Sequence, residues 1–190
     1  MMDGYLGRLD AMGATIVVTA DHGMNAKHDG QGRPDVIYLQ DVLDAWLGAA
    51  AARVILPITD PYVVHHGALG SFATAYLPET ADRADVLRKV AALDGVELAV
   101  GREEAARRFE LPADRIGDIV VVSTRHKVIG TSASRHDLSG LTEPLRSHGG
   151  ISEQRVPLMI NRRMALPGGR LRNFDAFDWA LNRATQEVLA

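Results

Sequence analysis

The sequence has 190 residues, of which 46% are hydrophobic and 24% are charged, a balance that excludes a disordered chain, a fibrous repeat and a coiled coil. Its 21 basic and 24 acidic side chains leave a net charge of −3, so no positive field attracts nucleic acid or an anionic membrane. The absence of cysteine excludes disulfides, thiolate zinc sites and a thiol nucleophile, so any bound metal must use histidine and carboxylate.

The cellular location is predicted from what the chain does not contain. Apolar runs in the sequence fall short of the roughly 20 residues that a membrane span needs. The first residues, Met-Met-Asp-Gly-Tyr, lack the basic region and apolar region of a signal peptide. We therefore expect a cytoplasmic enzyme that has neither a membrane nor a nucleic acid as its partner.

The first third of the chain predicts alternating helices and strands. Apolar residues at helical spacing predict a short helix that ends at Gly13. Residues 14–20 form a β-branched, almost uninterrupted apolar run, which is typical of a strand covered on both faces inside a parallel sheet. A polar, glycine-rich loop over 27–33 precedes a predicted helix over 38–52 and a strand over 53–58.

The middle of the chain predicts shorter elements in β-α-β-α-β order. The expected elements cover 72–77, 81–93, 96–100, 102–109 and 116–122, and a polar stretch follows at 123–139. Together they indicate a compact inserted subdomain. The last third returns to the opening pattern, with a strand over 156–161 and a helix from about residue 175 whose inward side chains are Phe177, Leu181, Ala184 and Val188.

The strongest local signal for chemistry is the pair Asp21 and His22, which stand where the apolar strand over 14–20 must end. In an open α/β sheet, ligands gather outside the carboxyl ends of the strands. A turn made permissive by Gly23 lets both side chains swing onto one ion, and carboxylate with imidazole suits Zn²⁺ or a similar divalent metal. The alternative interpretation is that Asp21 caps a turn and His22 is an ordinary loop residue.

His148 is the second candidate, because Gly149 and Gly150 follow it directly. Two glycines allow the backbone to approach a ligand closely, although they also suit any tight turn. Lys27 and His28 lie just beyond the Asp21–His22 pair, where they either face an anionic substrate or belong to a solvated loop. The residue pattern alone leaves both questions open.

Several segments carry a resemblance to a known family. The run Thr-Ala-Asp-His-Gly-Met over 19–24, followed after a long insert by Ser-His-Gly-Gly over 147–150 and Val-Pro-Leu over 156–158, resembles the alkaline phosphatase superfamily. The segments 1–10, 21–28 and 145–150 are more closely similar to the phosphonoacetate hydrolases of that superfamily. The resemblance runs through the whole chain, and its motifs are specific.

This resemblance implies an α/β fold. Residues 1–58 and 140–190 would form part of an alkaline-phosphatase-like sheet sandwiched by helices, and residues 59–139 a small inserted α+β cap. The implied activity, part of phosphonate catabolism, cleaves the carbon–phosphorus bond of phosphonoacetate to give acetate and phosphate with the help of two divalent metal ions, expected to be Zn²⁺. The resemblance implies that Asp21 and His22 bind one metal, and that His148 binds the other and contacts the small anionic phosphonate substrate.

The family's nucleophilic threonine, its remaining metal ligands and the lysines that meet the substrate carboxylate have no counterpart in this sequence. We therefore expect the chain to be the C-terminal portion of such an enzyme, with no catalytic nucleophile of its own and no activity in isolation. Its expected partner is the N-terminal half of the enzyme, and a homodimer is a further family-level expectation. The alternatives are a phosphodiesterase or another phosphonate or phosphate hydrolase of the superfamily, and a non-catalytic isolated domain.

Overall fold

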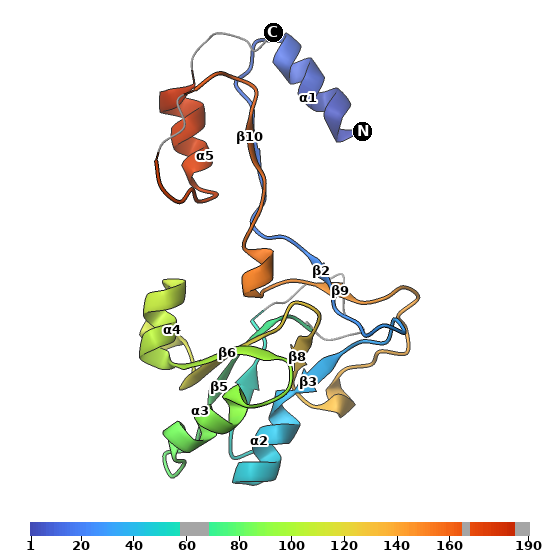
Figure 1. The fold of residues 1–190 in the computed structure, drawn as a ribbon, viewed down its shortest axis with the longest axis vertical. Coiled ribbons are helices and arrows are strands. Elements are labelled where there is room, and N and C mark those ends of the chain that lie inside the picture. Colours follow the sequence, from blue (N-terminus) through green and yellow to red (C-terminus); the bar gives the residue numbers. More distant parts are fainter. Residues whose placement is uncertain (58–68, 165–167, 185–190) are drawn as a thin grey trace. The chain divides into compact units, whose positions relative to one another are not determined.

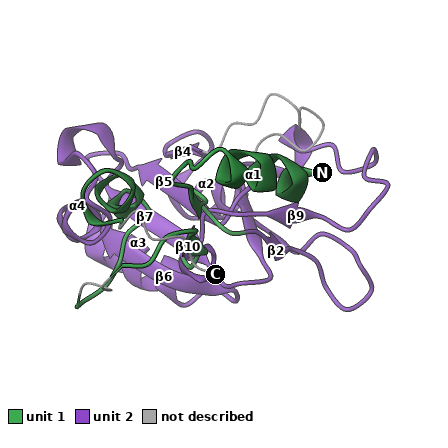
Figure 2. Ribbon diagram, turned by 90° about the horizontal axis from the view of Figure 1, so that it is seen from above, with its two compact units in different colours: residues 1–23, 155–190 green, residues 24–154 purple. Residues whose placement is uncertain are grey.

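The computed structural model describes residues 1–57, 69–164 and 168–184. The chain divides into two compact units, which Figure 2 colours separately: unit 1 holds residues 1–23 and 155–190, and unit 2 holds residues 24–154. These two units have other boundaries than the expected core (1–58 and 140–190) and cap (59–139). The expected boundary at residue 58 lies outside the described residues. That division remains a prediction. None of the described helices is both long and apolar enough to cross a membrane.

Unit 2 is built around a four-stranded antiparallel sheet with the strand order β4-β5-β7-β6 (Figure 1). Its strands are β4 (Arg53–Ile55), β5 (Phe72–Tyr76), β6 (Val96–Gly101) and β7 (Ile119–Ser123). Its helices are α2 (Leu39–Leu47), α3 (Arg83–Ala91) and α4 (Arg102–Phe109). The predicted β-α-β-α-β order is confirmed by the succession β5, α3, β6, α4 and β7.

Strand β7 is buried along its whole length, because helices cover both faces of the sheet. Ile119 and Val121 belong to the core cluster that includes side chains of α2 and α3, while Val120 clusters with Ala105 of α4. This alternation follows from the two-residue period of a strand. An antiparallel strand with two covered faces thus gives the same uninterrupted apolar run that is usually associated with parallel sheets.

Helix α3 shows how the sequence sets the bounds of an element. The Asp82 carboxylate accepts hydrogen bonds from the backbone N–H groups of Ala84 and Asp85, at 3.0 and 3.1 Å, and so caps the first turn. The buried face carries Val86 and Val90, four residues apart, and this spacing places both on one side of the helix. The helix therefore begins where its cap lies and packs along its apolar stripe.

Two shorter strand pairs complete unit 2. Strand β3 (Val36–Tyr38) pairs in parallel with β8 (Val128–Gly130), and β2 (Asn25–Ala26) pairs antiparallel with β9 (Arg146–Ser147). Short 3₁₀ turns occupy Ala113–Arg115, Ala133–Arg135 and Ile151–Glu153. The stretch over 123–139, which is polar in the sequence, also contains β8, whose three residues are all buried. A three-residue strand is too short to display a period.

Unit 1 contains α1 (Met2–Ala11), β1 (Val17–Thr19), β10 (Leu158–Ile160) and α5 (Asp175–Asp178), which continues as a π-helical turn over Trp179–Arg183. Strand β1 pairs antiparallel with β10, with Val18 opposite Met159. All three residues of β1 are half-buried. Within the described residues, the expected placement of this strand inside a parallel sheet and under cover on both faces is therefore wrong.

Unit 1 leaves most of its large apolar side chains exposed. Trp179 is buried, whereas Phe177 and Leu181, which were expected to pack inward, are 74% and 80% exposed. That expectation is wrong because residues two positions from the buried Trp179 lie on the opposite side of a helix. The other exposed large apolar residues of unit 1 are Met1, Met2, Tyr5, Leu9, Met12, Met159, Leu171 and Phe174.

A polar clip ties the end of α1 to the end of β10. The guanidinium of Arg162, a residue only 3% exposed, donates to the Asp10 carboxylate at 3.1 Å and to the carbonyl oxygen of Ala14 at 2.7 Å. The Asn161 amide donates to the same carboxylate at 2.6 Å, and its oxygen accepts from the N–H of Ile16 at 2.7 Å. Hydrogen bonds from Asn161, with help from Arg162, lower the pKa of Asp10 below its ordinary value.

We predict that replacing Leu43 with alanine lowers the free energy of unfolding by about 2–5 kcal/mol, because this fully buried side chain of α2 leaves a cavity in the main core. Leu9→Ala is the control, since Leu9 is 45% exposed and its loss should cost no more than about 0.5 kcal/mol. Urea denaturation followed by circular dichroism measures both changes. Equal losses would contradict the assignment of the core.

We predict that Asp10→Asn destabilises unit 1 at neutral pH and that its effect disappears in acid. A depressed pKa in the folded state stabilises above the unfolded value of about 3.9, and that stabilisation is lost as the pH falls through the folded value. The buried Trp179 reports on unit 1 by fluorescence in a Trp46→Phe background, because the chain has two tryptophans. A difference in urea midpoint that persists unchanged to pH 2 would contradict this role for Asp10.

Candidate active site

Asp21 and His22 lie directly after β1, and their side chains converge. The N–H of His22 donates to Asp21 Oδ1 at 3.0 Å, and His22 Nε2 lies 3.7 Å from Asp21 Oδ2. The Asp21 side chain is 86% exposed and that of His22 is 37% exposed. The backbone bends at Asp21, and a carboxylate oxygen and an imidazole nitrogen lie on one side of the chain. That the two side chains bind one metal ion remains a prediction.

The ring of His22 is held by its second nitrogen. Nδ1 lies 2.8 Å from the carbonyl oxygen of Gly23, a contact that favours the tautomer in which Nδ1 carries the proton and donates it. In that tautomer Nε2 carries the lone pair, on the side of Asp21. Histidines that bind metals usually donate their other ring N–H to a carbonyl or carboxylate in this way.

A buried hydroxyl lies two residues before this pair. Thr19 Oγ1 is inaccessible to solvent and has no hydrogen-bond partner among the residues that the structure describes. Buried polar atoms are almost always partnered, because an unsatisfied one costs roughly 1–3 kcal/mol. The end of β1 therefore carries a buried hydroxyl without a partner among the described residues.

His148 follows β9 in unit 2, at a turn that is tied down on both sides. Its carbonyl oxygen accepts from the N–H of Ser71 at 2.8 Å, and the preceding Ser147 hydroxyl donates to the carbonyl oxygen of Leu69 at 2.6 Å. Gly149 has a φ of 101°, a conformation that glycine adopts without strain. Gly149 thus serves the turn, and His148 is half-buried.

The predicted ligands are divided between the two units. Asp21 and His22 belong to unit 1, and His148 belongs to unit 2. Among residues 1–57, 69–164 and 168–184, no group of three or more histidine, aspartate or glutamate side chains is gathered in a way that would hold a metal ion. The metal assignment of these three residues therefore stays a prediction.

Comparison with known proteins identifies the family. No protein-family model matches the chain. The curated phosphonoacetate hydrolase of Penicillium oxalicum is 44% identical to it over 73 residues, which are 37% of this chain and 88% of that protein. The chain belongs to the phosphonoacetate hydrolase family.

Solved structures agree with this membership. The phosphonoacetate hydrolase of Sinorhizobium meliloti 1021, solved with phosphonoformate, is 64% identical, has a TM-score of 0.90, and is matched over 96% of this chain and 45% of its own. Its complex with phosphonoacetate gives a TM-score of 0.89. The chain thus spans less than half of that enzyme, in agreement with the expected C-terminal portion.

A more distant structure supports the expected α/β fold. Murine ectonucleotide pyrophosphatase/phosphodiesterase 5 is 22% identical, with a TM-score of 0.54, over 85% of this chain and 38% of its own. At that identity the likeness shows the fold alone. The family and the fold class predicted from the motifs are therefore both confirmed.

Lys27 has a role that neither sequence interpretation anticipated. Its side chain is completely buried and forms an ion pair with the equally buried Glu153, with 3.0 Å between Nζ and Oε1. It neither faces a substrate nor lies in a solvated loop, so both interpretations are wrong for this residue. His28 is half-buried, and its Nδ1 lies 2.8 Å from the carbonyl oxygen of Asp29. The sequence held one local signal for the role of Glu153, because the spacing Gly150-x-x-Glu153 is typical of a glutamate that caps a turn.

The surroundings act on the charges of the pair in opposite ways. Burial lowers the pKa of Lys27, because it disfavours the ammonium form, and the hydrogen bond with Glu153 opposes that shift. Burial alone would raise the pKa of Glu153, but hydrogen bonds from Asn25, Ser152 and Lys27 outweigh it and hold that pKa below its ordinary value. The carboxylate is therefore charged at neutral pH.

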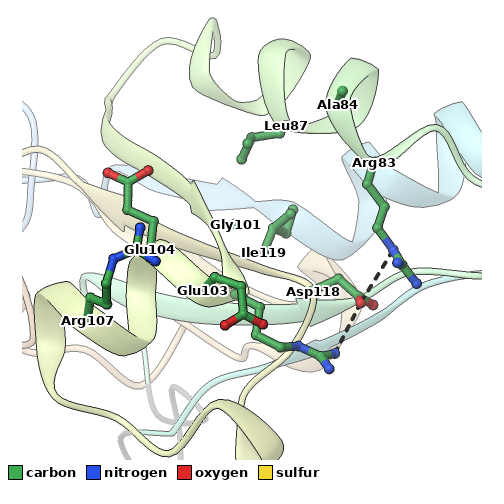
Figure 3. Close-up of a pocket in the computed structure, with 10 residues that line it drawn as sticks. Arg83, Ala84, Leu87, Gly101, Glu103, Glu104, Arg107, Asp118 and Ile119 are labelled. Atoms are coloured by element: carbon green, nitrogen blue, oxygen red, sulfur yellow. Dashed lines mark hydrogen bonds and ion pairs between the residues drawn. The ribbon is translucent and has the colours of Figure 1, made fainter.

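An open hollow near the start of α4 is lined by several charged side chains (Figure 3). Asp118 lies 3.4 Å from Arg83 and 3.1 Å from Arg102, and its second oxygen accepts from the N–H of Leu77 at 2.8 Å. These contacts join α3, α4 and the sheet. The charged side chains of Asp118, Arg83 and Arg102 in the hollow thus have a structural role within unit 2.

Proposed function

We propose that this chain supplies part of the active site of an enzyme that hydrolyses the carbon–phosphorus bond of phosphonoacetate to acetate and phosphate. The observation that carries the proposal is the convergence of Asp21 and His22 after β1, in a chain 64% identical to an enzyme solved with phosphonoacetate. In the net reaction the phosphorus–carbon bond breaks, water supplies the new phosphorus–oxygen bond, and the acetate carbon takes a proton.

In this proposal Asp21 and His22 hold one divalent metal ion, and His148 holds a second ion and contacts the phosphonate. Enzymes of the alkaline phosphatase superfamily generally depend on divalent metals, and Zn²⁺ suits the carboxylate and imidazole donors. With the proton on His22 Nδ1 donated to the Gly23 carbonyl oxygen, the lone pair of Nε2 would be available to hold the ion. When bound, the metal ions supply positive charge against the phosphonate oxygens.

Three ligands are too few for two metal ions, because a catalytic zinc ion is usually held by about three protein groups. The nucleophile and the remaining ligands therefore have to come from other residues. We propose that they are supplied by the part of the enzyme that this chain does not span, since the chain matches 45% of the solved relative. In isolation the 190 residues would then bind metal weakly and release no phosphate.

A phosphodiesterase function is not favoured by any particular side chain. It has only the fold likeness at 22% identity in its support, whereas the phosphonoacetate hydrolases are matched at 44% and 64% identity. A comparison of turnover on phosphonoacetate and on a nitrophenyl phosphodiester decides between the two substrate classes. The proposal requires the phosphonate to be turned over with the higher kcat/KM.

We predict that His22→Ala and His148→Ala each lower kcat/KM for zinc-dependent phosphate release by more than about tenfold. Loss of a supporting residue around a metal commonly costs about 10–100-fold in affinity or activity, and loss of a ligand should cost at least as much. The assay uses the protein expressed from its complete natural coding sequence. Bound zinc is determined in parallel by competition with a chromogenic chelator.

The matched control is His126→Ala, because His126 is exposed and its Nδ1 contacts only the backbone, at the Ala26 carbonyl oxygen. Its activity and zinc content should stay within twofold of wild type, on the order of the small effects expected at surface sites. A loss of less than tenfold in either ligand variant would remove that residue from the proposed site. Absence of zinc-dependent phosphate release by the wild type would overturn the proposed function itself.

A further inference from the structure

The Lys27–Glu153 pair is fully satisfied by hydrogen bonds within unit 2. Lys27 Nζ donates to Glu153 Oε1 at 3.0 Å, to Ser71 Oγ at 2.6 Å and to the carbonyl oxygen of Arg125 at 2.8 Å, which uses all three of its protons. Glu153 Oε1 also accepts from the amide of Asn25 and from the Ser152 hydroxyl. This is a completed polar network in the interior.

The network forms hydrogen bonds to both ends of the 148–150 turn. Glu153 Oε2 accepts from the N–H of Gly150 at 2.7 Å, on one side of the turn. On the other side, Ser71 Oγ accepts a hydrogen bond from Lys27 Nζ, and the Ser71 N–H donates to the carbonyl oxygen of His148 at 2.8 Å. The backbone on either side of Gly149 is thereby fixed to one buried ion pair.

The pair also lies close to the neighbouring strands. The Lys27 N–H donates to the carbonyl oxygen of Leu145 at 2.8 Å, just beyond the β2–β9 pairing (Figure 1). Gly150 packs so tightly here that an added Cβ would lie 2.6 Å from Glu153 Oε2 and 3.1 Å from the Cβ of Ser71. The backbone of Gly150 therefore packs directly against the Glu153 carboxylate and Ser71, with no space left for a side chain.

Stability alone is a poor reason for such a pair. Removing two charges from water costs several kcal/mol per ion, and buried pairs replaced by well-packed apolar side chains often leave a protein equally or more stable. What apolar side chains would not reproduce is the set of directed hydrogen bonds to Gly150 and Ser71. The geometry therefore indicates a role in holding the turn.

We propose that Lys27 and Glu153 are positioning residues that fix the backbone of the 148–150 turn and so aim the His148 imidazole. The proposal rests on the proposed function, in which His148 binds metal and contacts the phosphonate. Lys27 and Glu153 touch neither metal nor substrate. They act through Ser71 and Gly150 on the residue that does.

The decisive variant is the double replacement Lys27→Met with Glu153→Leu, made in the protein from its complete coding sequence. It removes both charges together, so no unpaired charge remains in the interior, while the volume is roughly kept. We expect the melting temperature in chelator to stay within a few degrees of wild type. Zinc affinity should fall about 10–100-fold, the range typical of lost support around a metal ligand, and kcat should fall with it.

A readout without metal or turnover isolates the orientation of the ring. In protein labelled with ¹⁵N-histidine and kept in chelator, the His148 imidazole signals, assigned with His148→Ala, should shift or broaden in the double variant. The signals of His136, whose Nε2 accepts from the N–H of Thr131 at 2.9 Å, should not. An unchanged His148 spectrum together with unchanged zinc affinity would overturn the positioning role.

A second variant keeps the test sharp if the double variant does not fold. Glu153→Gln retains the shape, but its single amide oxygen has to choose between Lys27 and Gly150, which the two carboxylate oxygens serve together. We expect a smaller loss of zinc affinity, and unchanged affinity in a folded Glu153→Gln variant would overturn the proposal.

The matched control is Lys127→Met with Asp35→Leu, a partly exposed pair 2.8 Å apart, in which Lys127 also pairs with the exposed Asp94 at 3.0 Å. Its zinc affinity and kcat should stay within twofold of wild type. A wild type without zinc-dependent phosphate release refutes the proposed function. An active wild type with an equally active double variant refutes only the positioning role.

Discussion

Unit 2 depends on one strand with two covered faces. All five residues of β7 are buried, and the strand pairs with β5 on one side and β6 on the other. Burial of alternate side chains against different helices joins two core clusters through a single segment. The hydrophobic contribution to folding scales with the apolar area removed from water. Packing of the other strands and helices over β7 therefore stabilises the unit.

Unit 2 also buries a charged pair, Lys27 and Glu153, in its interior. The Lys27–Glu153 pair is the most buried of the described ion pairs, and every proton of Lys27 has an acceptor. A buried charge is tolerated only when its partners are fixed, so the pair and the loops around it define one another's geometry. The turn with His148 inherits this rigidity, although the residue itself is only half-buried.

Unit 1 has the opposite character. Asp21 and His22 contact each other, and the ion pair between Asp10 and Arg162 joins the end of α1 to the end of β10. Among its described residues, however, unit 1 buries one hydrophobic side chain, that of Trp179. Local geometry and a large core are thus separate requirements.

The sequence by itself determined the family, the fold class and the β-α-β-α-β order of the middle segment, because motifs and hydrophobic periods are local properties of the chain. It also placed Asp21 and His22 just beyond the end of a strand. Only the tertiary structure decided that β1 pairs antiparallel with β10, that Trp179 faces inward, and that Lys27 is buried against Glu153. Residues 126 positions apart meet through folding, and no local pattern records which distant partner will neutralise a charge.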